Sequence, residues 1–501
     1  MNQTPTPAAL TALMALMALM ALALLALPGG ARAQAPDPGT LQARNWAAAC
    51  AGCHGPAGRA PAGSAVPALA GRDAGLQARQ ALQRREFLGA LAGTAMFGTL
   101  GAQAAARKAK VVVVGGGFGG ATAARYLREW SGQGIEVTLV EPNASFVSCP
   151  LSNLVLAGSK RIGDITLSYD ALAKRHGVKL VRDHVSAIDA ARREVRLAGG
   201  GTLAYDRLVL SPGVDVLSGE IPGLAQPGGE QILHAWKAGP QTVGLRRQLE
   251  AMRDGGTFAI TIPLAPYRCP PGPYERACLV ADYFSRAKPR SKVLILDANP
   301  DVTSKGALFK QVWATRYKDR VEYRPQYNTV DVDPATHTLK FEVQDDERAD
   351  VLNVLPPQRA GAIAVASGLA TANGRWCEVD FLTFESKAAP NIHVLGDAIQ
   401  IAPLMPKSGH MANQHGKVAA AAIVSLLAGH APNPEPLYNN TCYSFTSARE
   451  AIHIASVHRY DAAQRTMVTV PGSGGLSAAP NALEGTYAQS WADAIWTDML
   501  G

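Results

Sequence analysis

The fold is decided by "KVVVVGGGFGGATAARYLREW", the stretch from Lys110 to Trp130. Four consecutive valines predict a buried strand, and the apolar residues after the glycines recur at helical spacing. Between strand and helix stand Gly115, Gly117 and Gly120 in the pattern G-x-G-x-x-G. In such a unit the first glycine permits a tight turn, the second lets the backbone approach a pyrophosphate, and the third lets the helix pack closely on the strand. The stretch therefore predicts a dinucleotide-binding Rossmann unit.

Three later segments extend this prediction toward FAD. The next strand, "IEVTLVEPN", ends at Glu141, which is placed to accept a hydrogen bond from a ribose hydroxyl. Residues 205–213, "YDRLVLSPG", resemble the strand that leaves the FAD domain of two-dinucleotide flavoproteins, and "NIHVLGDAI" at 391–399 resembles their second FAD motif. The resemblance implies that Asp397, beside Gly396, bonds the ribityl chain. It also implies FAD as the cofactor.

A second Rossmann-like unit is predicted farther along, with a strand at 257–263, a helix from Tyr274 and a strand from Lys292. Its first turn should contain the glycines that cradle a phosphate. The turn reads "LAPYRCPPGPYERAC" instead, and Gly272 is its one glycine. Because proline lacks the amide hydrogen that a phosphate cradle needs, the sequence disfavours NADH binding here.

Two residues of this turn carry a different chemistry. Cys269 comes just before a helix N-terminus, where a thiolate would be stabilised, although a buried structural cysteine is the alternative. Glu275, on the first helical turn, is a candidate for moving protons, with a capping role at the helix terminus as the alternative.

From about Lys108 onward the chain resembles the flavoprotein subunit of flavocytochrome c sulfide dehydrogenase, a relative of sulfide:quinone oxidoreductase. The motifs "PYRCPPGPYERAC", "SCPLSN" and "NTCYS" carry the resemblance. It implies a redox disulfide between Cys269 and Cys442 over the flavin, which sulfide would attack to give a persulfide. It also implies a covalent link from Cys149 to the flavin 8α-methyl group. Pro150 departs from the family motif, which has an aromatic residue there.

The segment "KSGHMANQHGK", from Lys407 to Lys417, is predicted to begin a helix. In the superfamily this helix points its N-terminus at the flavin pyrimidine, where the helix dipole favours negative charge, and Lys407 would add a full charge. We interpret His410 and His415 as polar residues along the helix. Trp496 resembles a family tryptophan near the flavin, with plain packing as the alternative.

The N-terminal part carries two export signals. Residues 1–33 hold a long apolar run that ends in "PGGARA", which predicts a signal peptide cleaved after Ala33, with an uncleaved membrane anchor as the alternative. Residues 84–107 contain "RREFLGALAGTAMFGTLGAQAAA", which resembles a twin-arginine signal. Both indicate a periplasmic protein, without stable membrane insertion after processing.

Between these signals, residues 34–83 carry the C-x-x-C-H spacing of c-type haem attachment in Cys50, Cys53 and His54. The two thiols would bond the haem, and His54 would bind the iron. Only about thirty residues follow before the next signal, and none of them is methionine. A helical haem domain needs roughly 80 residues or more, so the segment is predicted to be a truncated cytochrome, and haem loading stays open.

These observations predict an α/β fold of two Rossmann-like domains in the disulfide-reductase-like flavoprotein architecture. The FAD domain is expected at 108–225 and 370–430, the second domain at 226–369, and a C-terminal redox and interface domain at 431–501. Nucleic acid is excluded as a partner because the basic residues behind the net charge of +8 are scattered.

The function predicted is periplasmic oxidation of sulfide to sulfur or polysulfide, with a c-type cytochrome as electron acceptor. The alternatives are a sulfide:quinone oxidoreductase and a non-catalytic electron-transfer module.

Overall fold

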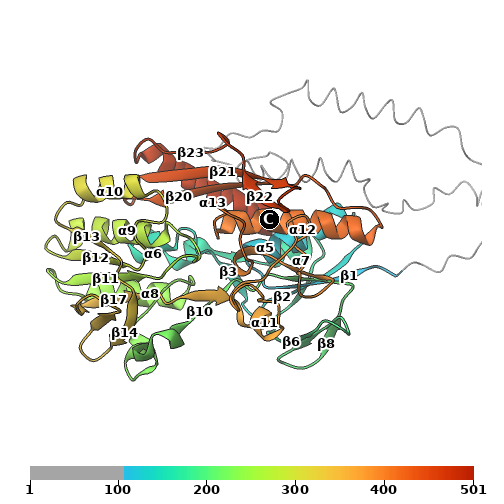
Figure 1. Ribbon diagram of the computed structural model, residues 1–501, viewed down its shortest axis with the longest axis horizontal. Coiled ribbons are helices and arrows are strands. Elements are labelled where there is room, and N and C mark those ends of the chain that lie inside the picture. The colour runs from blue at the N-terminus through green and yellow to red at the C-terminus, as the bar shows by residue number, and fades with distance from the viewer. Residues whose placement is uncertain (1–106) are drawn as a thin grey trace, which may run out of the picture. The chain divides into compact units, whose positions relative to one another are not determined.

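The computed structural model describes residues 107–501 (Figure 1). Both predicted export signals, apart from Arg107, and the predicted haem ligands Cys50, Cys53 and His54 lie outside the described residues. No helix within 107–501 combines the length and apolar character that crossing a membrane requires. The same part of the chain holds no group of histidine, cysteine and acidic residues that could bind a metal ion.

The first sheet is parallel and has five strands in the order β19-β9-β1-β2-β5. Helix α5 follows β1 directly, and α12 packs against α5. The predicted strands and helices of the FAD domain are therefore confirmed. Their bounds are β1 Lys110–Val114, α5 Phe118–Trp130, β2 Glu136–Val140, β5 Lys179–Val181, β9 Arg207–Leu210, β19 Ile392–Val394 and α12 Gly409–Leu427.

The second sheet is also parallel, in the order β13-β12-β11-β17. The predicted strand–helix–strand unit is confirmed, although its helix begins at Gly272 and not at Tyr274. The bounds are α8 Pro240–Ala251, β11 Thr257–Ile262, α9 Gly272–Ala287, β12 Lys292–Asp297, α10 Gly306–Thr315, β13 Val321–Pro325 and β17 Val351–Val354. The chain therefore repeats one architecture twice, as the sequence predicts.

The chain leaves the first sheet and returns to it through one antiparallel pair. β10, Val214–Val216, pairs with β18, Gln358–Ala360. Ala360, and Ala364 of α11 (Ala362–Ala366), already pack in the core of the first sheet. The return to the first core thus begins before the predicted boundary at residue 370.

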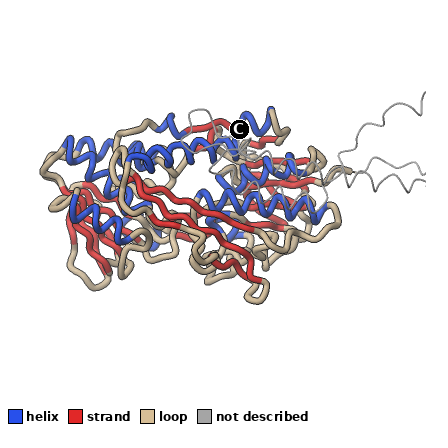
Figure 2. Tube along the Cα trace, turned by 90° about the horizontal axis from the view of Figure 1, so that it is seen from above, coloured by secondary structure: helices blue, strands red, loops and turns tan. Residues whose placement is uncertain are grey.

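The C-terminal part forms an antiparallel sheet followed by a helix. Strands β20, Leu437–Phe445, and β21, Ala451–Asp461, pair along their length, and β22, Thr466–Thr469, and β23, Gly475–Leu476, add to β21. β20 contacts α9 of the second unit as well as α12 of the first, and α13, Ala482–Leu500, packs beneath it. Figure 1 shows β20 and β21 running across both halves, and Figure 2 shows them from above.

Shorter elements fill the connections between these sheets. The strands are β3 Ser145–Val147, β4 Thr166–Ser168, β6 Val185–Asp189, β7 Glu194–Leu197, β8 Thr202–Ala204, β14 Thr329–Asp333, β15 Thr338–Phe341 and β16 Glu347–Arg348. The helices are α6 Ser152–Leu156, α7 Asp170–Lys174, and the single turns η2 Ile162–Ile165, η3 Ser218–Glu220, η4 Pro222–Ala225, η5 Gly229–Gln231 and η6 Gly396–Ala398.

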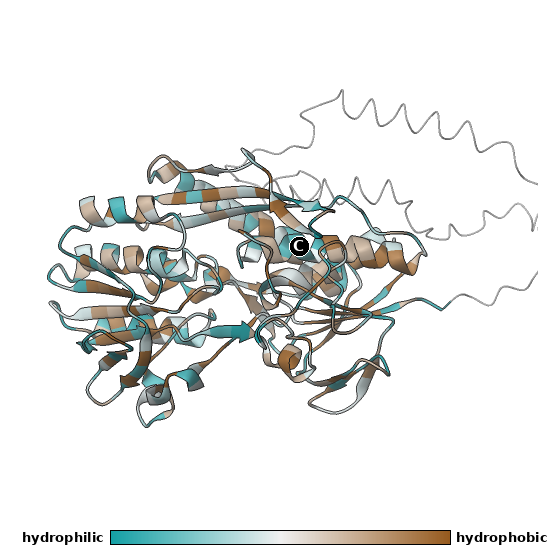
Figure 3. Ribbon diagram, in the orientation of Figure 1, coloured by the Kyte–Doolittle hydropathy of each residue, from teal (hydrophilic) through white to brown (hydrophobic). Residues whose placement is uncertain are grey.

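Separate hydrophobic cores hold the two parallel sheets. Val111 to Val114 of β1 are buried in the first core, and Phe258, Ile260 and Ile262 of β11 are buried in the second. Figure 3 shows hydrophobic residues along the strands and hydrophilic residues in many outer loops. Each fully buried side chain of this size contributes about 1.5–3 kcal/mol to the free energy of folding. The strands are therefore held firmly, and so are the ends of the loops that leave them.

Candidate active site

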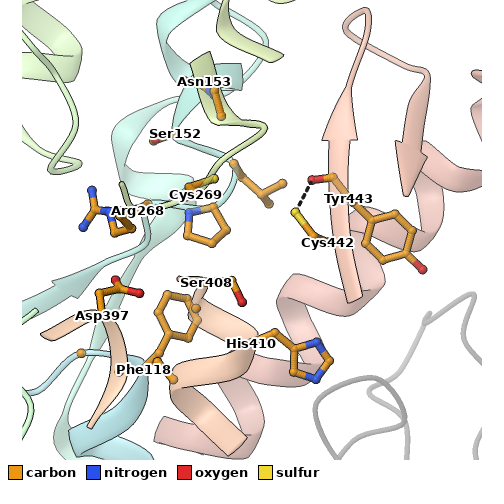
Figure 4. Close-up of a pocket in the computed structure, with 18 of the residues that line it drawn as sticks. Phe118, Ser152, Asn153, Arg268, Cys269, Asp397, Ser408, His410, Cys442 and Tyr443 are labelled. Atoms are coloured by element: carbon orange, nitrogen blue, oxygen red, sulfur yellow. Dashed lines mark hydrogen bonds between the residues drawn. The ribbon is translucent and has the colours of Figure 1, made fainter. Parts of the chain in front are cut away.

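A cavity of about 240 Å³ lies where the two Rossmann-like units and the C-terminal part meet. Its walls come from the N-terminal ends of α5, α6, α9 and α12, together with β20 and α13. Figure 4 shows lining residues from several of these segments, among them Phe118, Ser408 and Cys442. The cavity therefore collects residues that are far apart in the sequence.

The glycine loop has the geometry that the sequence predicts. Gly115 has a φ of +95°, and a Cβ on it would lie 2.3 Å from the carbonyl oxygen of Ser211. A Cβ on Gly120 would lie 1.9 Å from the carbonyl oxygen of Gly115, so neither position accepts a side chain. Gly117 lines the cavity, and a Cβ there would meet nothing within 4 Å. A ligand can thus approach the backbone at Gly117.

Glu141 lies beside this loop at the end of β2. Its carboxylate accepts hydrogen bonds from the backbone N–H of Gly116 at 2.7 Å and from the side-chain amide of Asn143 at 2.6 Å. Glu141 also lines a second, smaller cavity together with Tyr169 and Asp170. This position is compatible with the predicted ribose contact, which stays a prediction.

Asp397 indicates that the main cavity binds a polar ligand. It lies in η6 after Gly396, whose φ is +70°, and both residues line the cavity. Asp397 Oδ1 is buried and has no hydrogen-bond partner among the described residues. Burial raises the pKa of this carboxyl, with the charges of Arg268 and Lys407 opposing the rise. A buried acceptor without a partner fits a ligand that donates hydroxyl groups, as the ribityl chain of FAD does.

The N-terminus of α12 opens on the same cavity. Ser408 caps the helix, because its hydroxyl accepts a hydrogen bond from the N–H of Met411 at 3.0 Å. Gly409 and His410, in the first turn, line the cavity. The positive end of the helix dipole therefore points toward the cavity, and the predicted contact with the flavin stays a prediction.

Cys269 lies in the proline loop between β11 and α9 and lines the cavity. Its φ is +57°, in the left-handed region that residues other than glycine rarely adopt. Two backbone bonds hold this conformation: its N–H donates to the carbonyl of Lys407, and its carbonyl accepts from the N–H of Gly272, both at 2.8 Å. A Cβ on Gly272 would lie 3.0 Å from Cys269 Sγ, which explains why the loop keeps its glycine.

The electrostatics at Cys269 differ from the expectation that the helix N-terminus stabilises a thiolate there. Burial raises the pKa of its thiol, and the nearby Cys442 and Glu275 act in the same direction, while Arg268 and Lys305 oppose them. The expectation was wrong because the helix N-terminus was considered without the burial of the loop. A neutral thiol or a disulfide suits this position at rest.

Cys442, in the middle of β20, lines the same cavity and lies close enough to influence the ionisation of Cys269. Figure 4 shows the two cysteines entering the cavity from the proline loop and from β20. Both are free thiols in this structure. The structure thus brings the predicted pair together, and their disulfide stays a prediction.

Glu275 lies beside both cysteines. Its carboxylate accepts a hydrogen bond from the N–H of Phe445 at 2.8 Å and one from Asn153 Nδ2 at 2.9 Å. Burial raises the pKa of Glu275, and these two bonds, followed by the charge of Lys305, oppose the rise. The carboxylate therefore joins α9 to β20 at the cavity wall, in place of the surface capping role that was the alternative.

Cys149 also lines the cavity. It follows β3 and precedes α6, and its free thiol is half-buried among the lining residues. Its Sγ lies 3.9 Å from the carbonyl oxygen of Trp236. The neighbouring Pro150, where the family motif differs, also lines the cavity. Cys149 thus lies in the wall of the cavity, and its link to the flavin stays a prediction.

Comparison with known proteins assigns these segments to families. Residues 109–248 match pyridine nucleotide-disulphide oxidoreductases. Residues 242–356 match the family "Sulfide dehydrogenase [flavocytochrome c] flavoprotein chain, central", and 434–500 match "Flavocytochrome c sulphide dehydrogenase, flavin-binding". The sulfide dehydrogenase flavoprotein chain of Chlorobaculum thiosulfatiphilum is 63% identical over 46 residues, which are 9% of this chain and 94% of that sequence.

This chain belongs to the flavocytochrome c sulfide dehydrogenase flavoprotein family. It is a FAD-dependent oxidoreductase that acts on sulfide. The mitochondrial sulfide:quinone oxidoreductase of Mus musculus is 25% identical over 329 residues, covering 61% of this chain and 69% of that protein. The sulfide:quinone oxidoreductase structure from Aquifex aeolicus has a TM-score of 0.62 at 17% identity, covering 77% of this chain and 90% of its own, and confirms the fold class.

One predicted cofactor residue of this sulfide dehydrogenase flavoprotein is directed elsewhere. Lys407 is buried but does not line the cavity. Its ammonium donates to the carbonyl oxygens of Asp397 at 2.8 Å and Ile399 at 2.6 Å, and it lies 3.6 Å from the ring centre of Trp376. Burial lowers the pKa of Lys407 to about 7, although Asp397 acts in the opposite direction. Lys407 thus bonds the backbone of the second FAD motif and does not line the cavity.

A different tryptophan from the one singled out in the sequence reaches the cavity of this sulfide dehydrogenase flavoprotein. Trp496 is buried in the core, whereas Trp491, on the same helix α13, lines the cavity. Trp491 Nε1 lies 3.3 Å from His410 Nδ1, which also accepts from the N–H of Thr441 at 3.0 Å. His410 is thus a cavity residue, which its interpretation as a polar helix residue missed.

Two cationic residues near the cysteines of this family member, Arg268 and Lys305, were not predicted from the sequence. Arg268 lines the cavity, and its guanidinium donates to the carbonyl of Trp236. Lys305 reaches Cys442 from the loop before α10. Arg268 could have been predicted as a site residue because it directly precedes Cys269 in the sequence. No sequence signal joins Lys305 to a cysteine 137 positions away.

Proposed function

We propose that this chain oxidises sulfide through a Cys269–Cys442 disulfide beside FAD and delivers the electrons to a c-type cytochrome in the periplasm. The observation that carries the proposal is the shared cavity of two cysteines, Gly117 of the glycine loop and Asp397 of the second FAD motif. A sulfur pair next to the flavin site is the arrangement that thiol–disulfide exchange coupled to electron transfer requires.

The first step is attack of hydrosulfide on the disulfide. One new sulfur–sulfur bond forms, the bond between the cysteines breaks, and its electron pair remains on the released cysteine as a thiolate. Glu275 lines the same cavity as the two cysteines, burial raises its pKa, and we propose it as the group that exchanges protons there. When bound, FAD supplies the acceptor for the two electrons that leave the sulfur.

The proposed covalent link to Cys149 gives a direct test of cofactor placement. We expect the flavin absorption of the wild-type holoprotein to stay with the protein after acid precipitation, because a thioether survives unfolding. Cys149→Ala should release the flavin into the supernatant while the folded protein still binds it through the glycine loop. Cys377→Ala, a change at a buried cysteine outside the cavity, is the control. Flavin retained by precipitated Cys149→Ala protein would contradict the link.

The electron acceptor is tested on purified holoprotein with sulfide as donor. We expect reduction of a soluble c-type cytochrome at least tenfold faster than reduction of a soluble quinone analogue. The family description, which names a flavocytochrome, supports this choice. Activity with the quinone and none with the cytochrome would reverse it.

The proposed periplasmic location and haem segment rest on the motifs before residue 107. Cell fractionation tests the location, which a cytoplasmic holoprotein would contradict. The haem absorption of the denatured full-length protein tests whether Cys50 and Cys53 carry haem.

A further inference from the structure

Lys305 places a buried ammonium group against the reactive sulfur of Cys442. The residue lies just before α10, and only 5% of its surface is exposed. Its Nζ donates to the carbonyl oxygen of Cys442 at 2.7 Å and to Ser444 Oγ at 2.8 Å, and it lies 3.8 Å from Cys442 Sγ. These three contacts use the three N–H groups of a lysine.

The three partners do not neutralise this charge at rest. A carbonyl, a hydroxyl and a thiol or disulfide sulfur are all uncharged, and a buried cation without an opposite charge in contact is unfavourable. The Lys305 ammonium acts electrostatically on two other groups at the site, because it opposes the rise in the pKa of both Glu275 and Cys269. A negative charge formed on Cys442 would give Lys305 the partner that it lacks.

The backbone of Lys305 supports a functional placement. Its φ is +57° and its ψ is 32°, the left-handed conformation that glycine and asparagine adopt more readily. Strained conformations of this kind cluster at functional sites because the surrounding structure must hold them. The loop is held by Thr303, whose hydroxyl bonds Tyr267 at 2.8 Å and whose N–H bonds Tyr274 at 3.1 Å. The segment that carries Lys305 is thus fixed to the loop that carries Cys269.

We propose that Lys305 is a catalytic residue that stabilises the Cys442 sulfur as a thiolate when the Cys269–Cys442 disulfide opens. This inference rests on the proposed function. In the step, the hydrosulfide sulfur bonds to Cys269 Sγ, the bond between the cysteines breaks, and its electron pair stays on Cys442 Sγ. Cys269 then carries the persulfide, and no proton has to move during the exchange.

The two sulfurs differ in the way that this assignment requires. Thiol–disulfide exchange is faster when the leaving sulfur belongs to the more acidic thiol. Burial raises the pKa of Cys269, whereas Cys442 Sγ has the Lys305 ammonium in contact. A positive charge in contact stabilises a negative charge that forms on the sulfur. Cys442 is therefore the better leaving group.

The test measures thiol acidity and needs no turnover of sulfide. The full-length holoprotein is reduced with dithiothreitol, which is then removed, and the rate of alkylation of Cys442 by iodoacetamide is followed against pH by peptide mass spectrometry. In Lys305→Met we expect the pH midpoint of Cys442 alkylation to rise. The alkylation rate at pH 7 should fall to about one tenth of the wild-type rate or below, because a rise of one pKa unit lowers the thiolate fraction tenfold. Lys305→Arg should keep most of the wild-type rate.

Controls separate charge from folding. Lys310→Met changes a lysine in α10, the helix that follows Lys305. Its side chain is half exposed and its ammonium pairs with Asp301 at 2.6 Å, so the substitution should leave the midpoint unchanged. If Lys305→Met does not fold, Lys305→Gln removes the charge and keeps a donor for the carbonyl of Cys442 and for Ser444.

Two results would overturn the inference. One is an alkylation midpoint for Cys442 in the neutral variants equal to that of the wild type. The other is a persulfide found on Cys442 and not on Cys269 after one equivalent of sulfide is added and the reaction is quenched. Either result leaves the proposed function standing, since that function fails only if sulfide does not react through the cysteine pair.

Discussion

Replacing Cys269 or Cys442 by serine is expected to lower the rate of sulfide-dependent reduction of bound flavin by about 10³-fold or more. Each cysteine supplies one sulfur of the proposed disulfide, and a serine hydroxyl cannot form that bond. Residues that act as one unit have non-additive effects, so the double variant should be no slower than either single variant. The measurement is anaerobic stopped-flow absorption of the flavin after mixing with sulfide.

Two controls make the cysteine experiment specific. Cys278→Ala removes a fully buried thiol of α9 that contacts Trp313 and does not line the cavity, and it should leave flavin reduction unchanged. The oxidised flavin spectrum of each variant shows whether FAD is still bound. Flavin reduction at the wild-type rate in both serine variants would refute the disulfide mechanism.

Lys417→Met is expected to lower the free energy of unfolding by about 3–5 kcal/mol, because it leaves Asp498 as a buried charge without its counterion. Lys417 Nζ lies 2.7 Å from Asp498 Oδ2, and their side chains are 1% and 0% exposed. Asp498 also accepts hydrogen bonds from Tyr126 at 2.6 Å and Asn413 at 2.8 Å, so it joins α13 to α5 and α12. The measurement is the midpoint of urea unfolding, followed by tryptophan fluorescence.

Two further variants test whether the unpaired buried charge of Asp498 causes the loss of stability. Lys174→Met breaks an exposed pair with Asp170 and should change the unfolding free energy by less than about 0.5 kcal/mol. Adding Asp498→Asn to Lys417→Met removes the unpaired charge and should recover part of the loss. Equal unfolding midpoints for Lys417→Met and Lys174→Met would show that the buried pair does not stabilise the helix packing.

The parts of the site that the sequence predicts are those encoded locally. Gly115 and Gly117 stand between a buried strand and a helix, Gly120 lies in the first turn of that helix, and this order determines where a pyrophosphate can approach. The proline loop likewise indicates a different role for Cys269. The loop lacks the glycines and amide hydrogens that bind a phosphate, so it does not serve a second nucleotide. The pairing with Cys442 came from the family resemblance, which the shared cavity supports.

The parts that the sequence did not predict depend on packing between distant segments. The direction of Lys407 follows from the carbonyls of Asp397 and Ile399, which bind its ammonium on the side away from the cavity. Trp491 reaches the cavity, whereas Trp496 on the same helix lies in the core, and only the docked orientation of α13 distinguishes them. Spacing along the chain carries no information about such contacts.

The course of β20 has a consequence for biosynthesis. Cys442 comes from this strand, and α13, which packs beneath it, is anchored through Asp498. A chain emerging from the ribosome therefore displays its glycine loop and Cys269 long before the second sulfur and the helix that supports it. Domains generally fold in the order of synthesis. The complete redox centre is thus a late product of translation, and an interrupted chain would hold the nucleotide-binding half without the means to react with sulfide.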